Sequence, residues 1–215
     1  MTVKRRYSSA RRDLAAEQTR HRVLLAAKTL FAESGIDSVT IAEIAEQAGV
    51  AASTIYGLFK SKAGLVEGLM RASLFGERYH AAMSVMDGVA DAAMRIALTP
   101  SVSRAIYEGE ILEMEIIRGA SAFSSGLREI EARFEAMRYE MQADRIEALF
   151  AQGKAKSGLD QEDARRIMWV HTSREVFRML IVESGWSPEK YEHWLADTLL
   201  DALVAPHARP LHLFD

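Results

Sequence analysis

The sequence predicts an all-α fold. Apolar residues recur at helical spacing along most of the 215 residues, and strand-like alternation between turns is hard to find. Only four prolines interrupt the chain, at positions 100, 188, 206 and 210. Apolar types make up 49% of the residues and charged types 27%, close to the averages for globular proteins. We therefore expect helices separated by short breaks rich in Gly, Ser, Asp and Pro.

The first helix is expected over residues 14–34, after a polar and basic segment that we expect to be irregular. Val23, Ala27, Leu30 and Phe31 fall at i, i+4, i+7 and i+8, which gives the helix one apolar face. Gly35 is a typical C-terminal stop, because glycine adopts the left-handed conformation without strain.

Three further helices are expected in close succession. Thr40 and Glu43 form a capping box at the start of the second, which Gly49 ends after about two turns. The third has Ile55, Leu58 and Phe59 as its apolar face. Ser61 is a plausible N-cap for a fourth, long helix that begins near Lys62.

The rest of the chain is expected to form a larger helical part of about nine helices. Asp160 and Ser187 are candidate N-caps, and Pro188 suits the first position of a helix because that position needs no N–H donor. The first two of these helices are expected to end near residues 88 and 98. The next four are expected to span residues 101–118, 127–152, 161–183 and 188–204.

Composition excludes several classes of protein. The chain has no cysteine, so disulfides, a thiolate nucleophile and Cys-based metal sites are excluded. Its apolar stretches are far shorter than the roughly 20 residues that cross a bilayer. The basic N-terminus is not followed by the apolar stretch of a signal peptide. We therefore expect a cytoplasmic protein with no membrane partner, no metal and no cofactor.

The net charge of −3 is unevenly distributed. Residues 1–65 carry 10 Lys and Arg against 6 Asp and Glu, a net of +4, whereas residues 66–215 carry 17 against 24, a net of −7. A basic segment joined to a larger acidic part indicates that the first part binds something anionic, although a difference of this size also arises by chance.

Residues 40–62 have the spacing of a helix-turn-helix, which is two short helices joined by a turn at 48–51. Ile44, Ala45, Val50, Ile55 and Phe59 are placed to form one small core under the first helix. The small side chain of Ala45 allows the two helices to cross closely. The outer face of the third helix is then free to enter a major groove.

This segment resembles the N-terminal domain of the TetR family of bacterial transcriptional regulators. The resemblance covers residues 20–66, and its order and spacing are unbroken. It rests on three runs: Ala26-Ala27-x-x-Leu30-Phe31-Ala32-Glu33-x-Gly35, Thr40-x-x-x-Ile44-Ala45-x-x-Ala48-Gly49-Val50, and Thr54-Ile55-Tyr56-x-x-Phe59-x-x-Lys62-x-x-Leu65.

The resemblance implies a homodimer that binds palindromic double-stranded DNA, usually represses, and is released by a small apolar or amphipathic effector. It implies a flexible basic arm (1–13), a helix-turn-helix DNA-binding domain (14–62), an effector-binding and dimerisation domain (63–205) and a tail (206–215). Carried over position by position, the resemblance implies that phosphates are contacted by Thr40, Tyr56 and Lys62. The residues that face the groove are Ala51, Ala52, Ser53 and Thr54.

The sequence departs from the family pattern in the third helix. The family often has Ser at Ala51, a basic or polar residue at Ala52, a larger residue at Gly57, and His or Tyr at Leu58. The third helix here therefore has no cation and few donors that read bases. We expect modest direct readout, with phosphates, DNA shape and the basic arm contributing more.

Two further sites are expected in the larger domain. Any one apolar residue there is more often core than ligand contact, but a cavity between helices is expected near Tyr107, Ile111, Met114, Phe134 and Trp169. The last two helices are expected to form a four-helix dimer interface. Its residues are Phe177, Leu180, Ile181, Trp194, Leu195 and Leu199.

Other functions remain open from the sequence. The weak third helix leaves a helical ligand-binding or sequestering protein, with a weakened DNA-binding head, as the alternative. An enzyme is the least supported class, because no HExxH, phosphate loop or GxSxG turn is present. We expect no catalytic residues.

Overall fold

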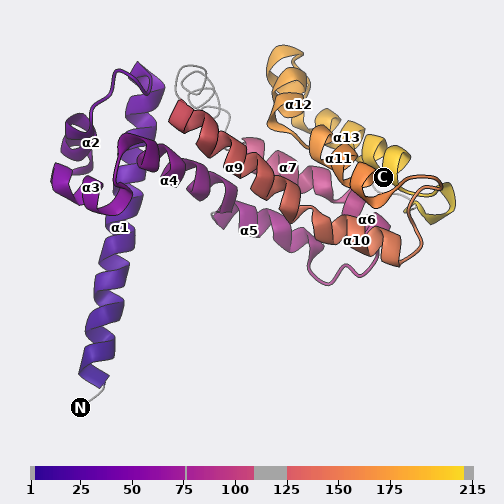
Figure 1. Ribbon diagram of the computed structural model, residues 1–215, viewed down its shortest axis with the longest axis horizontal. Coiled ribbons are helices and arrows are strands. Elements are labelled where there is room, and N and C mark those ends of the chain that lie inside the picture. Colours follow the sequence, from indigo (N-terminus) through magenta and orange to yellow (C-terminus); the bar gives the residue numbers. More distant parts are fainter. Residues whose placement is uncertain (1–2, 76, 109–124, 211–215) are drawn as a thin grey trace. The chain divides into compact units, whose positions relative to one another are not determined.

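The computed structural model describes residues 3–75, 77–108 and 125–210 (Figure 1). The regular elements in those ranges are helices, apart from one isolated β-bridge between Ala155 and Val204, so the predicted all-α fold is confirmed. The chain forms two compact units, Met1–Ala72 with Leu112–Ile130, and Ser73–Ile111 with Glu131–Asp215.

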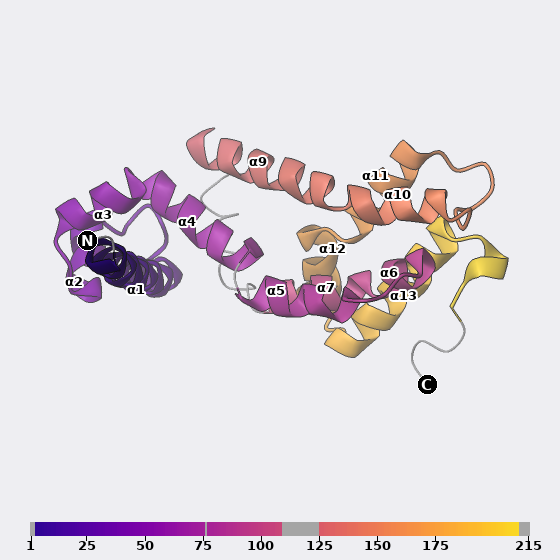
Figure 2. The same cartoon turned by 90° about the horizontal axis from the view of Figure 1, so that it is seen from below.

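The first unit begins with the long helix α1 (Val3–Ser34), followed by α2 (Ile41–Ala48), α3 (Ala52–Phe59) and α4 (Lys62–Phe75). Figure 2 shows α1 nearly end-on, with α2 and α3 beside it. The helix extends upstream of the expected start at 14 and includes most of the predicted irregular arm. Residues 3–13 contain neither Gly nor Pro and are rich in Arg, which favours helix.

The core of the first unit is the small cluster that the spacing predicts. Ile44, Ala45, Ile55 and Phe59 are buried, whereas Val50 is half-buried. From α1, the buried face consists of Val23, Leu24, Ala26, Ala27 and Phe31, with Leu30 half-buried. The three helices therefore enclose one apolar centre and leave the opposite faces of α2 and α3 to solvent.

Two glycines of α4 allow it to pack closely on the end of α3. A Cβ atom on Gly64 would lie 1.9 Å from the carbonyl oxygen of Phe59, and one on Gly68 would lie 2.8 Å from the Phe59 ring. Most of α4 therefore packs with the first unit. The domain boundary expected from the sequence lies earlier, after residue 62.

The second unit contains helices that pack around α13. α13 contacts α6, α7 and α11, α5 contacts α7, and α10 contacts α6 and α11. Their bounds are α5 Glu77–Met83, α6 Ala92–Ala97, α7 Thr99–Glu108, α10 Ala143–Ala151, α11 Gln161–His171, α12 Arg174–Arg178 and α13 Pro188–Leu203. Helix α9 (Ser125–Met141) continues into α10, and residues 179–183 form a π-helical turn after α12.

Two predicted helices are interrupted in the structure. The helix expected over 127–152 is divided at Gln142, and the one expected over 161–183 is divided at Thr172 and Ser173. The Ser173 side chain accepts from the Val176 N–H and so starts a new helix. The predicted caps Asp160 and Ser187 are confirmed, because each accepts a backbone N–H from the first turn that follows.

Arg104 links α7 to α13 through carboxylates. Its guanidinium pairs with Glu189 at 2.6 Å and Glu192 at 3.0 Å on α13, and with Glu108 on its own helix at 3.2 Å. These hydrogen bonds raise the pKa of Arg104 even though partial burial opposes the charge.

In the described part of the chain, no helix combines the length and the apolar character needed to span a bilayer.

Candidate functional site

Thr40 begins α2 with a complete capping box. Its hydroxyl accepts from the Glu43 N–H at 3.2 Å, and its own N–H donates to the Glu43 carboxylate at 2.6 Å. These hydrogen bonds hold the pKa of the Glu43 carboxyl below its usual value. Both residues are exposed, so the start of α2 is ordered at the surface of the first unit.

Replacing Thr40 by alanine is expected to lower the free energy of unfolding of the first unit by about 1 kcal/mol. The substitution removes the acceptor for the Glu43 N–H, whereas Thr40→Ser keeps it and should lose little. Chemical denaturation followed by circular dichroism measures the difference. Equal stabilities for the two variants would show that the capping hydroxyl contributes nothing.

The turn between α2 and α3 is closed by backbone hydrogen bonds. Gly49 adopts φ 65° and ψ 41°, and its N–H donates to Glu46 O, while the Val50 N–H donates to Ala45 O at 3.0 Å. Ala51 then precedes α3 without a side-chain cap, as its lack of a hydroxyl predicts. A left-handed residue at this point reverses the chain and sets α3 across α2.

The outer face of α3 is open and carries small polar groups. Ala51, Ser53 and Tyr56 are exposed, with Tyr56 at 51%, and Ala52 and Thr54 are half-buried. Helix α3 contains no acidic or basic residue. The face can donate hydroxyl hydrogen bonds and offer methyl groups, but it has no cation of its own.

Lys62 lies at the start of α4 and holds the loop before α2. Its ammonium donates to Val39 O at 2.8 Å and to Asp37 O at 3.2 Å. An ammonium has three N–H donors, so one remains for another acceptor. Lys62 therefore ties the start of α4 to the loop that positions Thr40.

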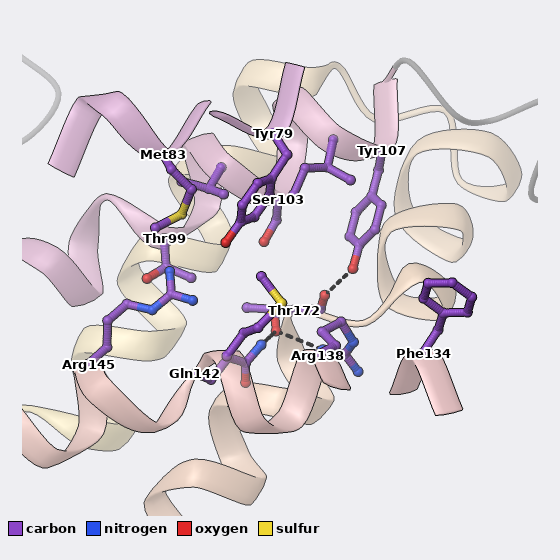
Figure 3. A pocket seen from close by; sticks show the side chains of 13 residues that line it. Tyr79, Met83, Thr99, Ser103, Tyr107, Phe134, Arg138, Gln142, Arg145 and Thr172 are labelled. Carbon is purple, nitrogen blue, oxygen red and sulfur yellow. Dashed lines mark hydrogen bonds between the residues drawn. The ribbon is translucent and has the colours of Figure 1, made fainter. Parts of the chain in front are cut away.

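A pocket lies in the second unit, between α5, α7, α9 and α10 (Figure 3). Its cavity volume is about 60 Å³, and the pocket is partly open to solvent. Apolar side chains of Met83, Val102, Ile106 and Met141 form much of its wall, and Tyr79 and Thr99 contribute hydroxyls.

The structure brings two of the predicted pocket residues together. Tyr107 and Phe134 line the pocket, and the Tyr107 hydroxyl donates to Thr172 O at 2.8 Å. Trp169 does not line it, because Met168 and Thr172 occupy the buried face of α11 and the adjacent position points elsewhere. Ile111 and Met114 lie outside the described residues.

The polar residues of the pocket were not predicted. Arg138, Gln142 and Arg145 all line it. Arg138 donates to Trp169 O at 2.8 Å and pairs with Glu135 at 2.7 Å. Gln142 and Arg145 are three residues apart, so they share a face with buried Ile146 and Leu149. Polar residues at apolar helix positions are a sequence signal that could have revealed them.

Three of the predicted dimer contacts are buried within the protomer. Leu195 and Leu199 are fully buried and Phe177 is 1% exposed. Residues this buried have no surface left for a second chain. Both faces of these helices are apolar in sequence, so periodicity could not separate core from surface. Leu180, Ile181 and Trp194 are half-buried.

Exposed apolar side chains instead lie elsewhere on the same segments. Val170, Met179 and Val182 are 49%, 43% and 49% exposed.

Among the residues that the structure describes, no group of three or more His, Asp or Glu side chains is placed to hold a metal ion.

A short capped helix, a glycine turn and a second short helix with an open face define a helix-turn-helix DNA-binding head. Residues 23–69 match the family model for bacterial regulatory proteins of the tetR family. The transcriptional repressor KstR2 of Rhodococcus jostii (strain RHA1) is 29% identical over 190 residues, which cover 84% of this chain and 89% of that protein. Together these matches indicate a DNA-binding transcriptional regulator of the TetR family.

Solved structures share the fold over nearly the whole chain. A TetR-family regulator from Rhodococcus sp. matches with a TM-score of 0.70 and 24% identity, over 87% of this chain and 99% of that one. FadR of Bacillus subtilis, solved with stearoyl-CoA, matches with a TM-score of 0.67 and 22% identity, over 83% and 96%. The arrangement of an N-terminal head and a larger helical part is therefore that of known regulators.

Proposed function

We propose that this protein represses transcription as a homodimer that binds a palindromic operator and leaves it when a small molecule occupies the pocket. The observation that carries the proposal is the open polar face of α3 beside the capped start of α2. KstR2, to which the chain is similar, is a repressor, which supports repression here as well.

The head would bind DNA through phosphates more than through bases. Thr40, Tyr56 and Lys62 would contact phosphates and so fix the position of α3 in the groove. Ala51, Ala52, Ser53 and Thr54 would face the bases, where methyl groups contact thymine and hydroxyls bond to several base edges. Because α3 carries no cation, DNA shape and the basic residues at the start of α1 would contribute to selectivity.

The dimer would set the spacing of the two heads. Recognition helices about 34–36 Å apart reach successive major grooves on one side of a duplex. The exposed side chains of Val170, Met179 and Val182, with half-buried Leu180, Ile181 and Trp194, would form the apolar interface.

The pocket would receive the effector. A pocket with a largely apolar wall and several polar groups is typical of small-molecule sites. FadR of B. subtilis, which shares the fold, holds stearoyl-CoA in its solved structure. We propose that binding in this pocket changes the separation of the two heads and releases DNA. No catalytic role is assigned to the chain, and its location in the cytoplasm stays a prediction.

The salt dependence of DNA binding tests the contacts assigned to the head. The logarithm of the binding constant for a mixed-sequence duplex should fall linearly with the logarithm of the salt concentration. The slope should be about −0.9 for each phosphate contacted by a cation. Lys62→Gln should reduce this slope by about 1. Tyr56→Phe should weaken binding about fivefold and leave the slope unchanged, because it removes a neutral donor. Fluorescence anisotropy measures both.

Two results would contradict these assignments. An unchanged slope in Lys62→Gln would show that the lysine only holds the loop through Asp37 and Val39. Affinity that does not respond to salt in the wild-type protein would contradict DNA binding by this head altogether.

A further inference from the structure

The pocket contains a buried arginine that has no carboxylate partner among the described residues. Arg145 projects from α10 and is 8% exposed. Figure 3 shows its side chain extending toward Met83 and Thr99, on the side of the pocket where the Tyr79 hydroxyl points. Among the described residues, the acceptor that it reaches is the thioether sulfur of Met86, 3.9 Å from Nη1. A thioether is a weak acceptor and carries no charge.

Two other arginines of this unit, Arg138 and Arg104, pair with carboxylates. Arg138, in the same pocket, pairs with Glu135 and donates to two oxygens of α11 and its C-terminal end. Arg104 pairs with three carboxylates. Among the residues that the structure describes, no carboxylate lies within ion-pair distance of Arg145.

The surroundings of Arg145 disfavour its charge without removing it. Burial lowers the pKa of Arg145 to about 10. Tyr79 and Asp144 favour the charged form, and Arg95 opposes it. At neutral pH the guanidinium is therefore a cation in an apolar wall, a state that costs folding free energy unless an anion pairs with it.

A second polar group in the same wall is unsatisfied. The Gln142 side chain is 4% exposed and donates through Nε2 to the Thr172 hydroxyl at 2.8 Å. Its Oε1 atom is buried, and the described residues supply no partner for it. Buried polar atoms are nearly always hydrogen-bonded in folded proteins. Gln142 Oε1 is such an exception, and it lies directly before α10, three residues from Arg145 in the same pocket wall. We take this as a sign that the wall receives the polar part of a ligand.

We propose that the pocket binds an amphipathic anion whose carboxylate pairs with Arg145. Its apolar part lies against Val102, Ile106 and Phe134. A planar guanidinium matches a carboxylate with two parallel hydrogen bonds, and the low dielectric of the buried site strengthens the pair. This inference rests on the proposed effector role of the pocket and narrows the effector to a class of molecule.

Three probes with the same tail and different head groups test the charge preference. Octanoate, octanol and octylamine are titrated into the purified full-length protein at pH 7 by isothermal calorimetry. Octanoate is expected to bind at least about tenfold more tightly than octanol, and octylamine not measurably, because its ammonium would face Arg145. No DNA is present, so the result is independent of operator binding.

Variants of Arg145 assign the preference to this side chain. Arg145→Met should remove the difference between octanoate and octanol, while the fold persists because an unpaired buried charge is replaced by an apolar chain. Arg145→Lys keeps the positive charge but cannot form the two parallel hydrogen bonds of a guanidinium, so it should retain part of the preference for octanoate over octanol. Arg166→Met removes an exposed arginine paired with Glu162 and should bind octanoate as the wild type does.

The outcomes separate this inference from the wider proposal. Octanol or octylamine binding as tightly as octanoate would overturn the anion preference and leave an effector pocket in place. A preference that persists in Arg145→Met would overturn the role of Arg145. Binding by none of the three probes would overturn both this inference and the effector role.

Discussion

Replacing Gly64 by alanine is expected to unfold the helix-turn-helix head and abolish DNA binding. The new Cβ would lie 1.9 Å from the Phe59 carbonyl oxygen, a backbone atom that cannot rotate away. Relief requires α4 to move from the end of α3, which separates Phe59 from its place beside Gly68 and Leu24. We expect a loss of about 3 kcal/mol or more in the free energy of unfolding of the first unit.

Gly57 provides the matched control for this substitution. It lies on the exposed face of α3, where an added Cβ has no atom within 4 Å. Gly57→Ala should stabilise α3 by up to about 1 kcal/mol, because alanine is the better helix former. The two variants add the same methyl group and are expected to act in opposite directions.

Hydrogen exchange over residues 41–72 measures the effect where it occurs. All three tryptophans lie beyond residue 168, so their fluorescence reports the second unit and serves as an internal control. Gly64→Ala should speed exchange in α2, α3 and α4 and leave the tryptophan signal unchanged. Protection equal to that of the wild type would contradict the close approach of α4 to Phe59.

Replacing Leu195 by alanine is expected to destabilise the protomer by about 3 kcal/mol. Leu195 is fully buried on α13, so the substitution leaves a cavity in the core of the second unit.

Replacing Val182 by glutamate is expected to weaken the dimer and not the protomer. Val182 is 49% exposed, so the protomer should keep its stability to within about 0.5 kcal/mol. Its new carboxylate would be buried by a second chain, and the dimer should dissociate.

Thermal unfolding and sedimentation velocity separate the two effects. Leu195→Ala should lower the midpoint of unfolding, and Val182→Glu should shift the protein from dimer to monomer at equal concentration. A Val182→Glu protein that stays dimeric would move the interface away from residues 179–183. A Leu195→Ala protein that is stable but monomeric would return Leu195 to the interface.

The helix-turn-helix could be predicted in detail from the sequence. Its signals are local: Thr40 and Glu43 are three residues apart and cap one helix, and Gly49 takes the positive φ that ends it. Interactions over so short a distance in sequence depend little on the rest of the fold. For this reason the caps, the turn and the buried residues of α2 and α3 agree with the expected ones.

The close packing of α4 was not predicted, because its cause is an absent atom. A glycine in a helix usually lowers the helical propensity, and the sequence does not show whether a neighbour requires the missing side chain. The requirement at Gly64 depends on where the Phe59 carbonyl lies. That position depends on the turn between α3 and α4, where Lys60 adopts a positive φ of 68°.

The pocket could be predicted only in part. Of the predicted residues that the structure describes, Tyr107 and Phe134 line the pocket and Trp169 does not. Arg145 was missed because charged residues are expected at the surface. In a segment where both helix faces are apolar, as around Leu195, the sequence does not distinguish protomer core from dimer contact.

Selection of bound sequences from random duplex DNA is the most direct test of the account. The purified protein is incubated with the random pool at near-physiological salt, and bound duplexes are amplified and sequenced. The account predicts enrichment of one inverted repeat, with half-site centres about 10 base pairs, or a multiple of that spacing, apart. A folded, dimeric protein that enriches no sequence would contradict it and favour a ligand-binding protein whose head no longer reads DNA.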